Sequence, residues 1–269
     1  MKYINSGDFI YKEFPTVVTV GNFDGLHKGH RALIDKLKEI KTATGGKSLI
    51  CSFSPRPIEV LRNIKPGYIL TPAERAEAAA ILGVDILVEY PFSLEISRMS
   101  GEEFIKTILT EQFNCKYMVV GTGFAFGKNR EWNVEKISEL CSKLGIGFTA
   151  LPHKLTGEEK ISSTAIREYL KNGEITKANE LLGYDYYMTG TIGSIGENGA
   201  IRIEVDEWKI LPKNGMYISE IRLENGAVCS SRTSAVERAA KGQPGFVETY
   251  VNGAEGLPLG QKVKVVIKG

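Results

Sequence analysis

The chain has 269 residues, of which 42% are hydrophobic and 25% are charged, and its formal net charge is +2. The small net charge excludes a broad polyanion-binding face, so no nucleic-acid partner is expected and any nucleotide site must be local. The sequence opens with "MKYINSGDFI", without an apolar signal core, and it holds no apolar stretch near the roughly 20 residues that a membrane span needs. We therefore expect a cytoplasmic protein without membrane segments.

Predicted strands and helices alternate along the chain up to residue 183. The strands are expected at residues 16–23, 48–54, 85–92, 117–121 and 147–152, and the helices at 31–44, 71–83, 100–113, 134–145 and 163–183. Thr71 stands three residues before Glu74, which predicts a capping box at the start of the second helix. This alternation favours an α/β fold with a doubly wound parallel sheet, in which ligands bind beyond the carboxyl ends of the strands.

After Gly183 the pattern changes to short alternating runs separated by Gly, Asn and Pro. Such runs are typical of a small antiparallel β-barrel or sandwich, and "LENGAV" predicts a hairpin with an Asn-Gly turn. We therefore expect two domains, 1–183 and 184–269. The four cysteines, Cys51, Cys115, Cys141 and Cys229, are scattered without a C-x-x-C pair, which favours free, buried thiols.

The segment "GNFDGLHKGH", residues 21–30, holds two of the three histidines and lies between a predicted strand and a predicted helix. A helix N-terminus at such a junction presents backbone N–H groups and a positive dipole to an anion. His27 and His30 are spaced to share one face of the first turn, where two imidazoles can donate hydrogen bonds to a phosphate. A capped helix start with surface histidines is the simpler alternative. A metal site is disfavoured because His153 is remote in the sequence and no third ligand lies nearby.

A second candidate anion site lies in "ISSTAIREYL", residues 161–170. Ser162, Ser163 and Thr164 bring hydroxyls and helix-start N–H groups together, and Arg167 follows one turn later. The alternative is an ordinary Ser/Thr-capped helix.

Taken together, "GNFDGLHKGH" and "ISSTAIR" resemble the bacterial FAD synthetases, the riboflavin kinase/FMN adenylyltransferase family. The H-x-G-H segment is shared with a wider nucleotidyltransferase superfamily, whereas the "ISSTAIR" form is more specific. The resemblance covers residues 15–183. Further segments in this range follow in the order that the family shows: "FSPRP", "ILTPAERA", "LGVDILVEYPF", "MSGEEFIKTIL" and "YMVVGTGFAFGKNR".

The resemblance implies an FMN adenylyltransferase that makes FAD and pyrophosphate from FMN and ATP with Mg²⁺. The catalytic residues it implies are His27, His30 and Arg167; the ATP phosphate-binding residues are Gly21, Asn22, Phe23, Asp24, Gly29, Ser162, Ser163 and Thr164; the flavin-binding residues are Phe53, Pro55, Gly123, Phe124, Ala125 and Phe126. Mg²⁺ is expected to bind through the ATP phosphates, with Asp24 as the one candidate protein ligand. The sequence departs from the family at Ser54, Arg56, Gly123 and Ala125, where Glu, His, an acidic or amide residue, and a polar residue are common.

The second domain resembles the riboflavin kinase barrel of that family, but in degenerate form. "LPKNGMYISEI" matches the family's pattern, and Glu248 stands where the family keeps its catalytic base. The Pro-Thr-Ala-Asn element, whose Thr and Asn bind Mg²⁺ and nucleotide phosphate, is missing. We therefore expect a kinase-like barrel without kinase activity, and Glu248 to be an ordinary strand residue.

Three alternatives remain open from the sequence. The first is a bifunctional kinase and adenylyltransferase with an unrecognised phosphate loop. The second is a nucleotidyltransferase with another acceptor, and the third is a non-catalytic flavin-binding regulator. The oligomeric state is not indicated by the sequence.

Overall fold

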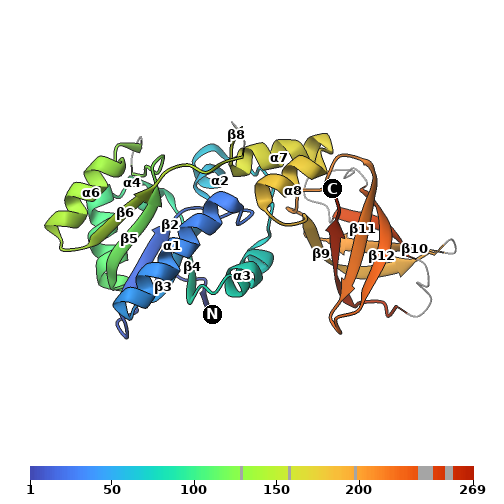
Figure 1. Ribbon diagram of the computed structural model, residues 1–269, viewed down its shortest axis with the longest axis horizontal. Helices are drawn as coiled ribbons and strands as arrows, with labels where there is room; N and C mark the ends of the chain where they lie inside the picture. Colours follow the sequence, from blue (N-terminus) through green and yellow to red (C-terminus); the bar gives the residue numbers. More distant parts are fainter. Residues whose placement is uncertain (128–129, 157–158, 197–198, 236–244, 252–256) are drawn as a thin grey trace. The chain divides into compact units, whose positions relative to one another are not determined.

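The computed structural model in Figure 1 describes residues 1–127, 130–156, 159–196, 199–235, 245–251 and 257–269. The chain forms two compact units. The first consists of Met1–Lys65 and Ala76–Leu155, and the second consists of Pro66–Arg75 and Thr156–Gly269. Among the residues described, no helix is long and apolar enough to cross a lipid bilayer.

The first unit is built on a six-stranded parallel sheet with the strand order β1-β4-β3-β2-β5-β6. Its strands are β1 (Lys2–Ile4), β2 (Thr16–Val20), β3 (Lys47–Ser54), β4 (Ile86–Pro91), β5 (Cys115–Gly121) and β6 (Gly147–Leu151). The chain passes from β2 to β3 on one side and reaches β5 on the other side of β2. The topological switch point, where such sheets bind ligands, therefore lies between β2 and β5.

Helices cover both faces of this sheet (Figure 1), as strands with almost continuous burial require: all five residues of β2 are buried. The helices are α1 (Lys28–Thr44), α2 (Pro57–Arg62), α4 (Leu94–Arg98), α5 (Gly101–Glu103), the π-helix η1 (Phe104–Gln112) and α6 (Val134–Lys143). Helix α3 (Pro72–Ile81) begins in the second unit and continues into the first. Apolar residues of η1 and α6 pack with Val18 and Val20 of β2. Helix α1 lies against β2, β3 and β5 with its own buried residues, which are outside that cluster.

The second unit is a closed antiparallel barrel joined to two helices. The barrel order is β10-β13-β12-β11-β14-β9. Its strands are β9 (Tyr187–Ile195), β10 (Ala200–Val205), β11 (Gly215–Leu223), β12 (Val228–Ala235), β13 (Gly245–Val251) and β14 (Lys262–Ile267), and its helices are α7 (Ser163–Asn172) and α8 (Ile175–Leu182). A two-stranded ribbon, β7 (Leu155–Thr156) and β8 (Glu159–Lys160), precedes α7. Side chains of α7, α8 and the barrel interior share one hydrophobic cluster.

The predicted α/β fold with a parallel sheet followed by a small antiparallel barrel is confirmed. The helix predicted over 163–183 is instead two helices, because Gly173 takes the left-handed conformation, with φ of 79°, and ends α7. The strand predicted over 16–23 ends at Val20, where a tight turn begins. The division into compact units places α7 and α8 with the barrel. The expected domain boundary at 183/184 rests instead on the change of sequence pattern after Gly183. The assignment of an adenylyltransferase domain and a kinase-like domain to either side of it stays a prediction. The four cysteines are free, and all but Cys229 are buried.

Candidate active site

The two histidines of "GNFDGLHKGH" begin α1. His27 is the N-cap residue, and its Nδ1 accepts the backbone N–H of His30 at 3.3 Å. The two imidazoles stack, with ring centroids 3.6 Å apart and planes at 15°. Because Nδ1 of His27 is an acceptor, this imidazole carries its proton on Nε2 when neutral and offers that N–H as a donor. The predicted shared face is therefore present as a stacked pair of rings.

The turn that precedes the histidines is conformationally unusual. Phe23, Gly25 and Leu26 all have positive φ angles, of 47°, 87° and 37°. Left-handed conformations cost free energy in residues other than glycine, and they cluster at ligand-binding sites. The buried Phe23 ring lies under His30, with centroids 4.8 Å apart, so only the backbone of Phe23 can reach a phosphate. A Cβ at Gly29 would lie 3.2 Å from the His27 ring, so this glycine makes room for the imidazole.

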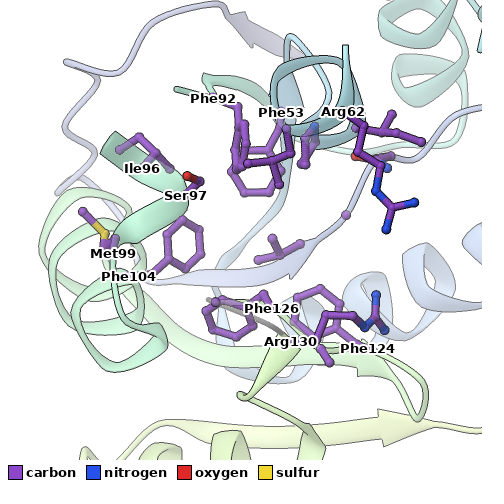
Figure 2. A pocket seen from close by; sticks show the side chains of 18 of the residues that line it. Phe53, Arg62, Phe92, Ile96, Ser97, Met99, Phe104, Phe124, Phe126 and Arg130 are labelled. Carbon is purple, nitrogen blue, oxygen red and sulfur yellow. The ribbon is translucent and has the colours of Figure 1, made fainter. Parts of the chain in front are cut away.

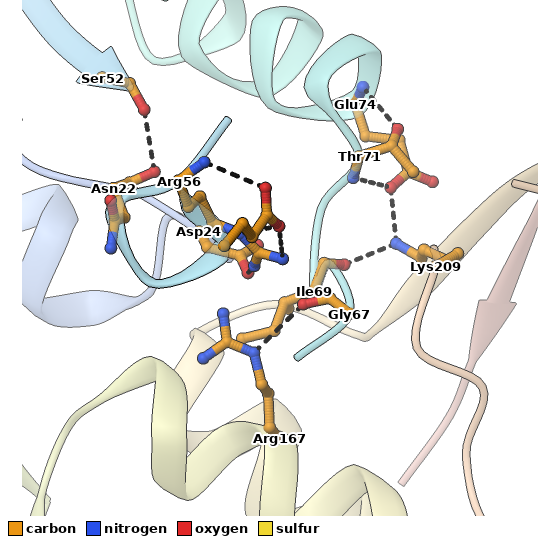
Figure 3. A network of polar contacts seen from close by, with 11 residues as sticks. Asn22, Asp24, Ser52, Arg56, Gly67, Ile69, Thr71, Glu74, Arg167 and Lys209 are labelled. Atoms are coloured by element: carbon orange, nitrogen blue, oxygen red, sulfur yellow. Dashed lines mark hydrogen bonds and ion pairs between the residues drawn. The ribbon is translucent and has the colours of Figure 1, made fainter. Parts of the chain in front are cut away.

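A buried cluster of charges holds this turn. The Asp24 carboxylate accepts a hydrogen bond from Nη1 of Arg56 at 3.2 Å, and the two side chains are 0% and 3% exposed. Nη2 of Arg56 also contacts Oε1 of Glu59 at 2.6 Å. Arg56 is the N-cap residue of α2, and its backbone N–H donates to Glu59 as well. The Arg at position 56 therefore ties the turn after β2 to the first turn of α2 (Figure 3).

A cavity of about 540 Å³ opens beyond the carboxyl ends of β2, β3, β4 and β5. Figure 2 shows aromatic side chains around this space, with Arg62 and Arg130 at one side. Its lining includes Gly21, Asn22, Phe53, Leu61, Arg62, Phe92, Met99, Phe104, Gly123, Phe124, Ala125, Phe126 and Arg130. All the residues expected to bind flavin therefore line this one cavity, except Pro55, with Phe53 on the side opposite Phe124 and Phe126 (Figure 2). Two residues expected to bind ATP, Gly21 and Asn22, line the same cavity.

The His153 side chain lies close to Gly123. A Cβ added to Gly123 would lie 2.4 Å from Nε2 of His153. The imidazole of His153 thus occupies the space that a side chain at position 123 would need. Nη2 of Arg130 also donates a hydrogen bond to the Gly123 carbonyl oxygen, at 3.2 Å. The third histidine, remote in the sequence, therefore lies next to Gly123, which lines the cavity.

The residues of "ISSTAIR" lie in the second unit, at the start of α7. Oγ of Ser162, the N-cap residue, accepts the N–H of Ala165 at 3.2 Å. Nε of Arg167 donates to the carbonyl oxygen of Gly67 at 3.3 Å. Ser163 and Thr164 form the first turn of the helix. The two predicted phosphate sites therefore lie in different units, each at a helix N-terminus.

Several residues of the cavity were not predicted from the sequence. Phe92 and Phe104 follow β4 and begin η1, and Arg62 ends α2. Phe92 and Phe104 lie in the quoted segments "LGVDILVEYPF" and "MSGEEFIKTIL" but were given no role there, and Arg62 lies outside every quoted motif. Only the parallel order of the strands brings these segments to one edge. Among the residues described, no group of three His, Cys, Asp or Glu side chains could hold a metal ion.

Comparisons with known proteins agree with these motifs. A family model described as FAD synthetase matches residues 11–165. A FAD synthetase from Listeria monocytogenes is 36% identical over 222 residues, covering 82% of this chain and 86% of that protein. A bifunctional riboflavin kinase/FMN adenylyltransferase from the same organism is 33% identical over 215 residues, covering 77% of this chain and 68% of that protein.

A solved structure shares the fold. A chain described as a macrolide-efflux protein from Streptococcus pneumoniae superposes with a TM-score of 0.89 at 22% identity, covering 99% of this chain and 90% of that one. At this identity the likeness concerns the fold alone.

Proposed function

Because the chain belongs to the FAD synthetase family, we propose that it transfers the adenylyl group of ATP to FMN, forming FAD and releasing pyrophosphate. The observation that carries this proposal is the composition of the cavity wall. Phe53, Phe124 and Phe126 suit a flat, apolar isoalloxazine ring, while Gly21 and Asn22 begin the turn that leads to the histidines. A flavin bound there would direct its phosphate towards that turn.

The chemistry needs no nucleophile from the protein. An oxygen of the FMN phosphate attacks the α-phosphorus of ATP in line, the bond from that phosphorus to the bridging oxygen breaks, and pyrophosphate leaves with the electron pair. The protein contributes positioning and hydrogen bonds to the charge that develops on the α-phosphate. His27 and His30 supply these donors from a helix N-terminus, whose dipole adds to the effect.

Mg²⁺ would bind to the ATP phosphates in this reaction. Mg²⁺ prefers oxygen ligands in octahedral geometry and often keeps only one or two protein carboxylates. The one candidate carboxylate, Asp24, is fully buried and paired with Arg56, so it does not fit as a ligand. The ion would neutralise charge on the triphosphate, whereas the residues of the turn hold the α-phosphate.

For the pyrophosphate end of ATP we propose Ser162, Ser163, Thr164 and Arg167. The resemblance of "ISSTAIR" to the family supports this role, as do the N–H groups of the first turn of α7. Arg167 would stabilise the negative charge that collects on the leaving group.

The barrel is proposed to lack riboflavin kinase activity. The Pro-Thr-Ala-Asn element is absent from the sequence. Val247 and Thr249 are buried in the barrel, so Glu248 between them faces outward, opposite Arg202 of β10. This supports an ordinary strand position for Glu248.

One experiment tests both parts of the proposal. The protein is incubated with ATP and Mg²⁺ together with either FMN or riboflavin, and the products are separated by chromatography. We expect FAD and pyrophosphate from FMN and no FMN from riboflavin. Steady formation of FMN would contradict the loss of kinase activity, and absence of FAD would contradict adenylyl transfer. Nicotinate mononucleotide and phosphopantetheine, offered in place of FMN, test the choice of acceptor.

A further inference from the structure

The segment before α3 lies beside residues 208–210 of the same unit and carries the carbonyl group that Arg167 contacts. Tyr68 in this segment pairs with the chain before β11: its N–H donates to the Trp208 carbonyl at 2.7 Å, and its own carbonyl accepts the N–H of Ile210 at 3.0 Å. The preceding residue, Gly67, has a φ of 81°, and a Cβ there would lie 2.8 Å from Cγ1 of Ile210. The direction of the Gly67 carbonyl is therefore set by its fit against residues 208–210.

A buried ion pair fastens the same segment. Nζ of Lys209 contacts Oε2 of Glu74 at 2.6 Å, and these side chains are 0% and 2% exposed. Nζ of Lys209 also donates to the Ile69 carbonyl at 2.6 Å, two residues after Gly67. The other oxygen of Glu74, Oε1, accepts the N–H of Thr189 from β9 at 2.7 Å. Breaking a buried pair of this kind is strongly destabilising, so the segment has little freedom to shift.

The arginine lies at the end of this chain of contacts. Nε of Arg167 donates to the Gly67 carbonyl, and Figure 3 shows the rest of the guanidinium extending past that bond. Ile166, the residue before it, is buried in the cluster formed with the barrel. The barrel thus supports both the helix that bears Arg167 and the carbonyl that orients its side chain.

We propose that Lys209 and Glu74 are positioning residues for adenylyl transfer, which hold segment 66–75 so that the Gly67 carbonyl aligns Arg167 with the ATP phosphates. The inference rests on the proposed function. It assigns the degenerate barrel a structural role in adenylyl transfer. The barrel acts as the support of Arg167 rather than as a kinase.

The test is a double-mutant cycle on the full-length protein. Lys209→Met removes the cation and the donor to Ile69 while keeping a side chain of similar length. We expect it to lower kcat/KM for ATP about tenfold, whereas Arg167→Ala lowers it roughly 10²–10³-fold. If Lys209 acts through Arg167, the double variant should match Arg167→Ala within about twofold, because the two effects are not independent. The affinity for FMN, measured by flavin fluorescence, should stay unchanged in Lys209→Met.

A control and a second variant complete the design. Lys268→Met removes partly exposed ion pairs with Asp185 and Glu220 in the same unit and should leave the kinetics unchanged. Lys209→Met leaves Glu74 buried without its cation, so Lys209→Met/Glu74→Gln, which removes both charges, serves the same cycle if the single variant does not fold.

The outcomes separate the inference from the function on which it rests. A double variant about tenfold slower than Arg167→Ala, or a folded Lys209 variant with wild-type kinetics, would overturn the positioning role. A wild-type protein that makes no FAD, or an Arg167→Ala variant with full activity, would instead overturn the proposed function at this residue.

Discussion

The chain has two helix N-termini that we assign to phosphate groups, and they are built differently. At α1 the capping side chain is itself the chemical group, because His27 both closes the helix and presents an imidazole. At α7 the cap is Ser162, and the cation is Arg167, whose side chain is oriented by the carbonyl of Gly67, one hundred residues earlier in the sequence. Each support contains a buried ion pair: Arg56 with Asp24 at α1, and Lys209 with Glu74 near α7.

The difference shows how far each site depends on distant parts of the chain. The first site depends on the ten-residue motif 21–30 and on Arg56. The second depends on segment 66–75 and on residues 208–210 of the barrel unit, which hold that segment. A local motif can therefore identify the first site, but only the fold shows what orients the arginine of the second. The following predictions test this contrast, from the largest expected effect to the smallest.

The largest effect is expected from removing the cation behind the first site. Arg56→Met leaves Asp24 and Glu59 buried without their shared partner, which should lower the free energy of unfolding by about 3–5 kcal/mol. Urea denaturation followed by circular dichroism measures this change. Arg222→Met, which removes an exposed pair with Glu220, is the matched control and should cost at most about 1 kcal/mol. Equal losses in the two variants would show that the buried cluster does not support the turn.

The next effect concerns catalysis at the first site. His30→Ala should lower kcat for FAD formation roughly 10²–10³-fold, because a donor to the developing charge is lost. His27 needs a more careful substitution, since it also caps α1. His27→Asn keeps a capping side chain and removes the imidazole, so it should lose activity while the melting temperature stays close to wild type.

The comparison variant at this position is His27→Ala. It should lose the same activity and also about 1 kcal/mol of stability, because the cap disappears. Pyrophosphate release and thermal unfolding, measured on both variants, separate capping from chemistry. Full activity in His27→Asn would mean that the imidazole matters only as a cap.

How much of this could be predicted from the sequence depends on how local each feature is. The capping box of Thr71 and Glu74 is confirmed in both directions, with hydrogen bonds of 2.9 and 3.3 Å. The further contacts of Glu74 with Lys209 and Thr189 could not be predicted, because the partners lie 135 and 115 residues away. Helices α2 and α4 were missed because six and five residues are too few to show a helical period.

In the cavity, too, residues that are distant in the sequence could not be placed from the sequence alone. Phe53 lies in β3, Phe124 and Phe126 follow β5, and all three were predicted. Phe92 and Phe104 needed the order of the strands to place them. The side chain that a Cβ at position 123 would meet belongs to His153, thirty residues later, at a position that no periodicity marks.

A smaller effect is expected where a neighbour of the first site is disturbed without touching the histidine turn. Gly123→Ala forces the His153 ring to move, which should raise KM for FMN about tenfold through lost fit in the cavity wall. KM for ATP should not change. Gly123→Ala/His153→Ala removes the clash and should recover most of the FMN affinity. Failure of this rescue would show that position 123 acts on the flavin directly rather than through His153.

The smallest effect lies at the far end of α1, where the two helices again differ. Lys41 near the end of α1 contacts Asp85 at 2.7 Å, and Asp85 also accepts the N–H and hydroxyl of Ser48. In α7, Lys171 pairs with Glu168 on the exposed surface. Burial alone would raise the pKa of Asp85, but the hydrogen bonds from Lys41 and Ser48 lower it below its ordinary value.

This shift sets the sign of a pH dependence. A carboxylate whose pKa is lower in the folded protein stabilises the fold above its unfolded pKa, and that stabilisation disappears as the pH falls through the folded pKa. Asp85→Asn should therefore cost roughly 1–2 kcal/mol at neutral pH, and its difference from wild type should shrink below about pH 4. Glu168→Gln should cost at most about 0.5 kcal/mol at any pH. Urea titrations between neutral and acid pH measure both, and an Asp85 effect that persists unchanged at acid pH would show that its hydrogen bonds do not require the charged carboxylate.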